Sequence, residues 1–213
     1  MSLARTDPGA ASIPLVTIHA DESCLGNGRD GSNPGGAGGI VEYRPEPGEL
    51  VRRDYWLSEP ATTNNRMALR SVIEGFHAIS ARGSRFRVIF TSDSRYLIDG
   101  LSDWVYGWSE RGWKRKGGAI ENLDLWRDAI ATLLDGGHLF EWRWVRGHQG
   151  HPQNEYANYL ATRAARDQST SNGLVASEFE NWLSQQKRKL EPEPFPASSS
   201  FKAAPRLPPP PLL

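Results

Sequence analysis

The stretch LRSVIEGFHAISARGSRFRVIFT, residues 69–91, decides the fold class. Its first half places apolar side chains at helical spacing, which predicts an amphipathic helix: Leu69, Val72, Ile73, Phe76 and Ile79. Thr62 or Thr63 is a suitable N-cap for this helix, and Gly83 is a suitable stop. The second half, Phe86–Thr91, is a continuous apolar-leaning run typical of a buried strand, so part of the sheet is expected to be parallel.

The remaining elements complete a mixed-sheet α/β domain. Three β-rich runs precede the helix, and their tight connections predict an antiparallel meander: Leu15–Ala20, Gly39–Tyr43 and Leu50–Leu57. The glycine-rich stretch Gly26–Gly39 is expected to be a loop. Short helices over 94–135, a last strand at Leu139–Val145 and a last helix at Pro152–Ala165 follow. The expected fold is a five-stranded mixed sheet flanked by helices.

Composition limits the class of protein and the extent of the domain. The chain has 213 residues with 25 basic and 25 acidic side chains, so a nucleic-acid partner would have to rest on local clusters of charge. A lone Cys24 excludes a disulfide framework, and no apolar run approaches the length of a membrane span or signal peptide. We expect a cytoplasmic monomer with no membrane partner.

The two ends of the chain differ in composition from the middle. Residues 1–12 are expected to be a disordered leader, and 13–167 form the predicted domain. Residues 168–213 predict a linker, a short amphipathic helix and a disordered tail that is rich in proline. This tail is either inert or a polyproline ligand for a partner that its composition does not identify.

Two acidic residues follow strands that are expected to run in parallel. Asp21 ends the first strand, and Asp93 lies two residues beyond Thr91. Carboxylates at the same end of parallel strands converge, and converging carboxylates without basic partners suit hard divalent cations. The alternative is that both are ordinary turn or cap residues.

Five motifs occur in one order along the chain: DESCLGN at 21–27, TNNRM at 63–67, TSDS at 91–94, RGWK at 111–114 and VRGHQGHPQNE at 145–155. In this order and spacing they resemble the type 1 ribonucleases H, and the resemblance covers Leu15–Asp167. It implies the ribonuclease H-like fold. It also implies hydrolysis of the RNA strand of RNA–DNA hybrids, which leaves 5′-phosphate and 3′-hydroxyl ends.

The resemblance further implies a two-metal site with Mg²⁺, for which Mn²⁺ is a possible substitute. Asp21 matches the first carboxylate of the family, and Asp93 matches the third. His148 matches a mobile histidine associated with proton transfer and product departure, and its glycine neighbours suit that mobility.

Two positions depart from the family pattern. The helix glutamate is replaced by Ala68, and the fourth carboxylate is replaced by Asn158. One interpretation is an inactive domain; the other is that Glu22 has taken over the lost carboxylate, as in the adjacent Asp-Glu pair of type 2 ribonucleases H. Glu74 is a weaker substitute, because six residues along a helix place it about 120° away from Ala68. Asn158 remains a possible ligand through its amide oxygen.

The resemblance also implies a substrate interface. It comprises residues that match a basic protrusion gripping the DNA strand, minor-groove contacts and backbone approaches: Cys24, Asn27, Asn64, Asn65, Arg95, Trp113, Lys114, Arg115 and Lys116. Trp104 is expected in the core. Two functions remain open, namely an active ribonuclease H that uses Asp21, Glu22, Asp93, His148 and Asn158, and a catalytically silent module that binds RNA–DNA hybrids.

Overall fold

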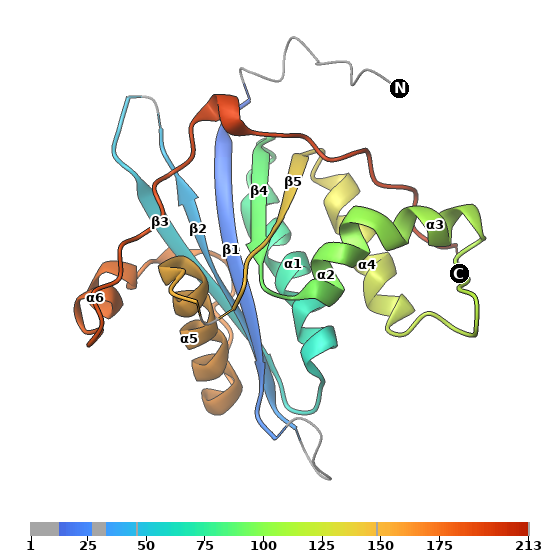
Figure 1. Cartoon of the computed structure of the whole chain (residues 1–213), viewed down its shortest axis with the longest axis horizontal. Helices are drawn as coiled ribbons and strands as arrows, with labels where there is room; N and C mark the ends of the chain where they lie inside the picture. Colours follow the sequence, from blue (N-terminus) through green and yellow to red (C-terminus); the bar gives the residue numbers. More distant parts are fainter. Residues whose placement is uncertain (1–12, 27–32, 46, 148, 213) are drawn as a thin grey trace.

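The computed structural model describes residues 13–26, 33–45, 47–147 and 149–212. Its centre is one mixed sheet in the order β5-β4-β1-β2-β3-β6 (Figure 1). The pairs β1–β2, β2–β3 and β3–β6 are antiparallel, whereas β1–β4 and β4–β5 are parallel. The strands are β1 (Leu15–Cys24), β2 (Gly35–Tyr43), β3 (Val51–Glu59), β4 (Arg87–Ser92), β5 (Leu139–Trp144) and β6 (Val175–Ala176). This confirms the predicted mixed sheet and adds the two-residue β6.

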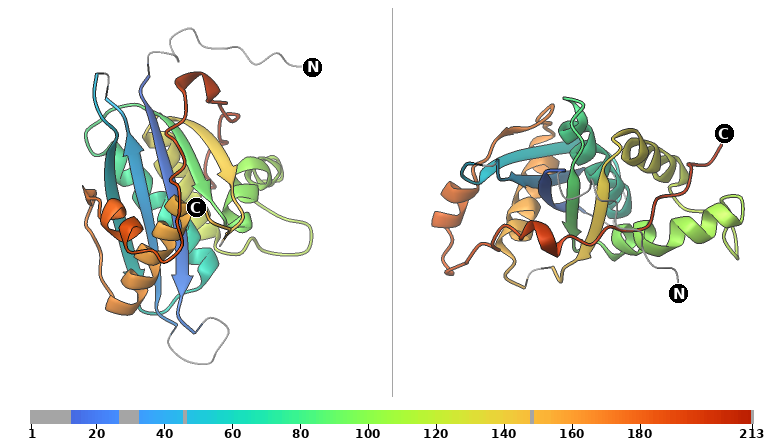
Figure 2. Two further views of the ribbon diagram at one scale, coloured as in Figure 1. Left: turned by 60° about the vertical axis from the view of Figure 1, so that its left-hand side comes forward. Right: turned by 90° about the horizontal axis from the view of Figure 1, so that it is seen from above.

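Helices cover both faces of the sheet (Figures 1 and 2). The predicted amphipathic helix is α1 (Asn64–Ser80), and its N-cap is Thr63, whose side chain accepts a hydrogen bond from the Arg66 backbone. On the same face lie α2 (Arg95–Asp99), the π-helical turn η2 (Gly100–Trp104), α3 (Val105–Glu110) and α4 (Leu123–Asp135). The opposite face carries α5 (Pro152–Asp167) and α6 (Phe179–Ser184).

Alternation along the strands separates two hydrophobic clusters. Even-numbered residues of β1 such as Ile18 face the main cluster under α1, which also contains Trp126 and, at its margin, Trp104. On the other face, Ile40 of β2 packs with Tyr156 of α5 and Phe179 of α6. Because successive side chains of a strand point to opposite faces, the two faces of β1 present different chemistry to α1 and to α5.

The last part of the glycine-rich stretch, from Gly35 to Gly39, belongs to strand β2 and not to the predicted loop. Gly36 and Gly38 lie in β2 directly under α5. A Cβ atom added at Gly36 would lie 2.2 Å from the Ala161 carbonyl oxygen, and one added at Gly38 would lie 2.6 Å from the Leu160 Cβ. Glycine is required here because the helix backbone approaches the strand closely.

Residues 168–212, which we call the C-terminal extension, lie against the domain and include η3 (Ser198–Ser200). This differs from the expected disordered tail. The Ala204 backbone N–H donates to the Phe140 carbonyl at 2.7 Å, and the Leu207 side chain is 4% exposed. The prolines therefore belong to an extended segment that is anchored by main-chain pairing and by a buried leucine.

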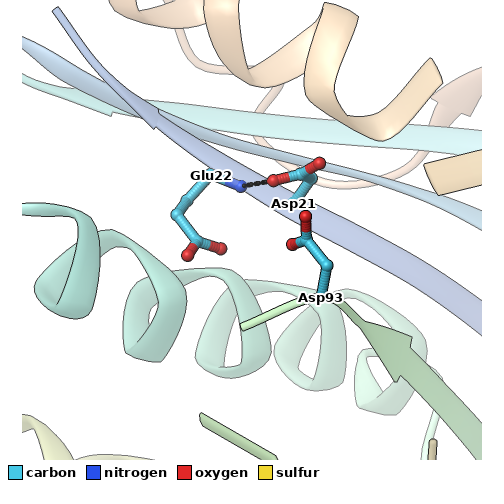
Figure 3. A group of neighbouring side chains, drawn as sticks. All are labelled: Asp21, Glu22 and Asp93. Carbon is cyan, nitrogen blue, oxygen red and sulfur yellow. Dashed lines mark hydrogen bonds between the residues drawn. The ribbon is translucent and has the colours of Figure 1, made fainter. Parts of the chain in front are cut away.

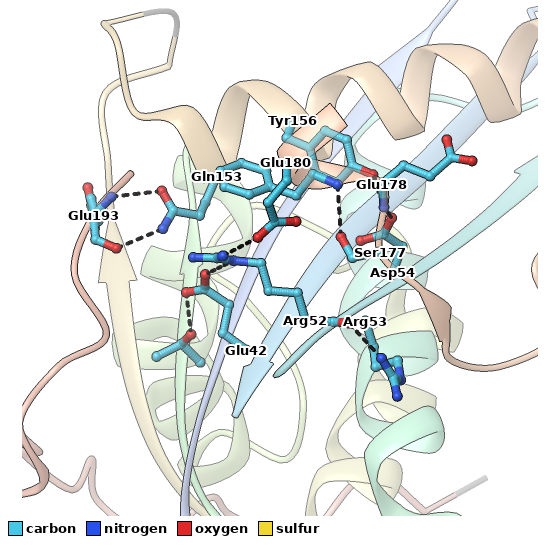
Figure 4. A network of polar contacts seen from close by, with 12 residues as sticks. Glu42, Arg52, Arg53, Asp54, Gln153, Tyr156, Ser177, Glu178, Glu180 and Glu193 are labelled. Atoms are coloured by element: carbon cyan, nitrogen blue, oxygen red, sulfur yellow. Dashed lines mark hydrogen bonds and ion pairs between the residues drawn. The ribbon is translucent and has the colours of Figure 1, made fainter. Parts of the chain in front are cut away.

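The first part of the extension also covers buried polar groups (Figure 4). Glu42 accepts a hydrogen bond at 2.7 Å from Arg52, which also pairs with Glu180 of α6. Asp54 accepts hydrogen bonds from the Tyr156 hydroxyl at 2.5 Å and from the Glu178 backbone at 3.1 Å. The extension thus supplies partners for carboxylates that are buried on the sheet.

No helix in the described residues is long and apolar enough to cross a lipid bilayer.

Candidate active site

Three carboxylates meet at one end of the parallel strands (Figure 3). Asp21 and Glu22 belong to β1, and Asp93 follows β4; each offers an oxygen within 4.8 Å of the others. The parallel register pairs His19 with Thr91, so Asp21 and Asp93 lie at the same level of the sheet. The structure confirms the predicted convergence of these side chains.

Glu22 reaches the cluster from the face of the sheet that α1 covers. Figure 3 shows its carboxyl group directed toward the same space as that of Asp93. Asp21 turns along the strand, where its Oδ1 accepts a hydrogen bond from the Glu22 backbone N–H at 2.7 Å. Ala68 is fully buried on the neighbouring face of α1, within the hydrophobic cluster. The cluster therefore contains a carboxylate from the α1 side of the sheet although α1 itself supplies none.

The electrostatics of the cluster favour a bound cation. Burial and the charge of Asp93 raise the pKa of Asp21 to about 8, against hydrogen bonds from the Glu22 backbone and Asn154 that lower it. Burial and the charges of Asp21 and Asp93 raise the pKa of Glu22 well above its usual range, and a hydrogen bond from Ser94 opposes the shift. Among the described residues, Asp21 and Glu22 have no basic ion-pair partner. Oxygen ligands with uncompensated negative charge are what Mg²⁺ and Mn²⁺ bind.

The helix α5 contributes amide side chains to the other side of the cluster. The buried Asn154 donates from Nδ2 to Asp21 Oδ2 at 3.2 Å. Asn158 is half-buried and lies one helical turn further along the same face. The sequence assigned Asn158 a ligand role, which stays a prediction, and it gave Asn154 no role although Asn154 belongs to the quoted motif.

Two predicted residues, Asn27 and His148, lie outside the described residues. The neighbour of His148 is informative, however, because a Cβ added at Gly147 would lie 2.0 Å from Asp93 Oδ2. The start of the loop after β5 therefore lies directly against Asp93, and a side chain at position 147 would require the Asp93 carboxylate or the backbone to shift.

Predicted substrate residues of the basic loop and of the start of α1 line a common hollow. Lys114, Arg115 and Lys116 are exposed in the loop after α3, whereas Trp113 is half-buried against the core. A hollow of about 370 Å³ connects Arg115 with Asn65, at the start of α1. Asn64 precedes Asn65, and its Oδ1 is buried without a hydrogen-bond partner among the described residues.

Cys24 lies at the end of β1 with its thiol directed toward backbone oxygens. Its Sγ donates to the Thr62 carbonyl at 3.4 Å and to the Asn33 carbonyl at 3.7 Å. Burial raises the pKa of this thiol. Cys24 is therefore a hydrogen-bond donor at the strand end, and its raised pKa disfavours the thiolate form.

Sequence reasoning missed Trp144, at the end of β5. Its Nε1 donates to the Asp93 carbonyl oxygen at 3.0 Å, and the Arg95 guanidinium lies 3.7 Å from its ring centroid. Trp144 is 38% exposed, so its ring is accessible beside Asp93. The sequence does carry a signal for this residue. Trp144 ends the last predicted strand, and that strand pairs with the strand that Asp93 follows.

Comparison with known proteins identifies the family of this chain. The RNase H family model matches residues 14–166. The "Ribonuclease H" of Polaromonas sp. (strain JS666 / ATCC BAA-500) is 38% identical over 159 residues, covering 74% of this chain and 92% of that protein. The "Ribonuclease H" of Erythrobacter litoralis is 41% identical over 155 residues, covering 72% of this chain and 98% of that protein.

Solved structures extend the comparison to the unusual cluster. The crystal structure of LC9-RNase H1, described as a type 1 RNase H with the type 2 active-site motif, has a TM-score of 0.86 and 60% identity. The match covers 92% of this chain and 94% of LC9-RNase H1. The adjacent Asp21-Glu22 pair and the alanine at position 68 are consistent with that description. The chain belongs to the RNase H family.

Proposed function

We propose that the protein hydrolyses the RNA strand of RNA–DNA hybrids and leaves 5′-phosphate and 3′-hydroxyl ends. The observation that carries the proposal is the cluster of Asp21, Glu22 and Asp93, which has the oxygen donors and the net charge for divalent cations. With Asn158 they would hold two Mg²⁺ ions, which when bound activate the attacking water and stabilise the leaving 3′-oxygen.

The chain's own residues have distinct tasks in this mechanism. Asn154 holds Asp21 in one orientation through the bond to Oδ2, and the backbone N–H of Glu22 holds Oδ1. His148 is proposed to carry a proton during the reaction and product departure. Asn154 and the Glu22 backbone act at the end of the sheet where the carboxylates converge.

The substrate interface is proposed to lie beside this cluster. The exposed Lys114, Arg115 and Lys116 would provide phosphate contacts for the DNA strand, and Asn64 and Asn65 would contact the minor groove. Contacts to 2′-hydroxyl groups distinguish the RNA strand, because DNA lacks that donor and acceptor.

The test is cleavage of an RNA–DNA hybrid labelled at the RNA 5′ end, beside RNA–RNA and DNA–DNA duplexes, with Mg²⁺, Mn²⁺ or EDTA. We expect cleavage of the RNA strand in the hybrid only, with either ion, and fragments whose 3′ ends a polymerase can extend. Binding of the hybrid without cleavage under all conditions would favour the silent binding module, for which Ala68 and Asn158 are the motivating departures.

The contact between Gly147 and Asp93 yields a prediction. The methyl group of Gly147→Ala would have to displace the Asp93 carboxylate or the loop carrying His148. We expect kcat to fall about 10- to 100-fold, the usual effect of a misplaced catalytic group, with a smaller change in KM. The control is Gly107→Ala in α3, since Gly107 has no positive φ and its added methyl group would meet only the flexible end of the Arg111 side chain. A Gly147→Ala enzyme with parental kcat would show that the loop tolerates a side chain there.

The Arg95–Trp144 pair yields a second prediction. If Arg95 contacts a phosphate of the hybrid, Arg95→Ala lowers affinity about equally for all sequences and reduces the slope of log K against log salt by about 1. Trp144→Phe keeps an aromatic ring under the guanidinium and is expected to retain the salt slope, whereas Trp144→Ala is not. Equal salt slopes for the parent and Arg95→Ala would exclude the phosphate contact.

A further inference from the structure

The C-terminal extension contacts the loop that leads into α5. The family model ends at residue 166, so the extension lies beyond the part of the chain that it matches. We propose that residues 191–196, which we call the C-terminal clamp, position the first turn of α5 for catalysis, with Glu193 and Gln153 as positioning residues for Asp21. This inference rests on the proposed function of the same site.

The clamp is fixed to α5 by two hydrogen bonds between the Gln153 side chain and the Glu193 backbone (Figure 4). Gln153 Nε2 donates to the Glu193 carbonyl oxygen at 3.0 Å, and the Glu193 backbone N–H donates to Gln153 Oε1 at 3.1 Å. The Gln153 side chain is buried, since the residue is 1% exposed. A buried amide that forms both bonds at once fixes the direction as well as the distance of the clamp, and leaving it unpaired would cost free energy.

The side chain of Glu193 adds a third contact to the same segment. Its Oε1 lies 2.5 Å from Nδ1 of His151, which is the N-cap residue of α5. From the helix side, Glu155 accepts a hydrogen bond from the Gly150 backbone N–H at 2.9 Å. Residues 150–153, at the start of α5, are therefore held both by Glu155 of the same helix and by a segment about 40 residues later in the sequence.

This held segment connects directly to the carboxylates. Asn154 follows Gln153 in the chain and donates to Asp21 Oδ2. At the other end of the loop, Gly147 lies against Asp93. A displacement of the first turn of α5 would thus move the donor that orients Asp21, and groups that orient a ligand are worth about 10- to 100-fold in metal affinity.

Other anchors of the extension lie away from this turn. Ser198 accepts a hydrogen bond from Arg87 at 3.0 Å, and Leu207 is buried in the main hydrophobic cluster. These contacts stabilise the fold without touching α5. They provide a control that separates a positioning effect from a loss of stability.

The experiment compares Gln153→Ala, Glu193→Ala and Glu193→Gln with the control Leu207→Ala in the full chain. Three quantities are measured: the Kd for Mg²⁺ by calorimetry, amide hydrogen exchange over residues 149–156 without metal, and kcat and KM on the hybrid. For Gln153→Ala we expect about 10-fold weaker Mg²⁺ binding, faster exchange and about 10-fold lower kcat at little change in KM.

Glu193→Ala keeps both bonds between the Glu193 backbone and the Gln153 side chain, so its effect is expected to be smaller than that of Gln153→Ala. Glu193→Gln is expected to behave like the parent, because the glutamine amide can still form a hydrogen bond with Nδ1 of His151. Leu207→Ala is expected to lower Tm while Mg²⁺ affinity and kcat stay parental. Parental Mg²⁺ affinity and exchange in Gln153→Ala would overturn the clamp. If the parent binds Mg²⁺ but cleaves nothing, the proposed function fails while the affinity and exchange data still decide the clamp.

Discussion

Asp21→Asn is expected to abolish activity and, at the same time, to make the metal-free protein more stable. Removing a carboxylate that holds both a metal ion and its neighbours costs several kcal/mol of transition-state stabilisation, so we expect kcat/KM to fall about 1,000-fold or more. Asn retains an oxygen that can accept one of the two hydrogen bonds made by Asp21, so the backbone is expected to stay in place.

The stability change follows from the raised pKa of Asp21. Its pKa rises from 3.8 to about 8 on folding, so the native state binds this proton more tightly than the unfolded state does. The free energy of unfolding therefore falls as the pH rises from about 4 toward 8. Asp21→Asn removes that loss, and we expect its Tm to exceed the parental Tm by on the order of 10 °C at pH 8, with little difference at pH 4.

Thermal melts in EDTA across pH 4–8 check this prediction, with Asp135→Asn as a control because Asp135 is exposed at the end of α4. Mg²⁺ is expected to raise the parental Tm more at pH 8 than at pH 6, and to raise that of Asp21→Asn much less. A Tm difference that shrinks with rising pH would contradict the electrostatic account of the cluster.

Local sequence patterns predicted the parts of the fold that depend on local periodicity. The apolar spacing of α1 and the continuous run of β4 sufficed for a parallel unit, and that unit places Asp21 beside Asp93. The resemblance across five motifs then singled out candidate acidic residues, whose roles stay predictions. The inferences about the fold succeeded because they rest on chain neighbours or on short, ordered motifs.

The parts that were missed depend on contacts between distant segments. Glycines in β2 are there because α5 packs on them, a reason that local propensity does not contain. The extension binds through main-chain groups and a few apolar side chains such as Phe179 and Leu207, so its proline content was misleading. Asn154 and Trp144 gained a role only once α5 and β5 were placed beside the carboxylates.

Strand alternation places the side chains of Asp21 and Glu22 on opposite faces of the sheet. It therefore does not predict by itself that the two carboxylates meet. The structure resolves this because Asp21 bends along the strand end while Glu22 stays on the face toward α1. We therefore propose that Glu22 replaces the missing helix carboxylate, and that its removal costs most of the activity.

The most direct test is the rate of RNA-strand cleavage, at saturating Mg²⁺, by the parent, Glu22→Ala, Glu22→Ala/Ala68→Glu and the control Asp135→Asn. We expect Glu22→Ala to lower kcat about 100-fold or more, since one ligand of a charge-stabilising site is lost. The double variant should regain part of that loss by supplying a carboxylate from α1, and Asp135→Asn should match the parent. Glu22→Ala cleaving as fast as an active parent would contradict the claim that Glu22 replaces the helix carboxylate.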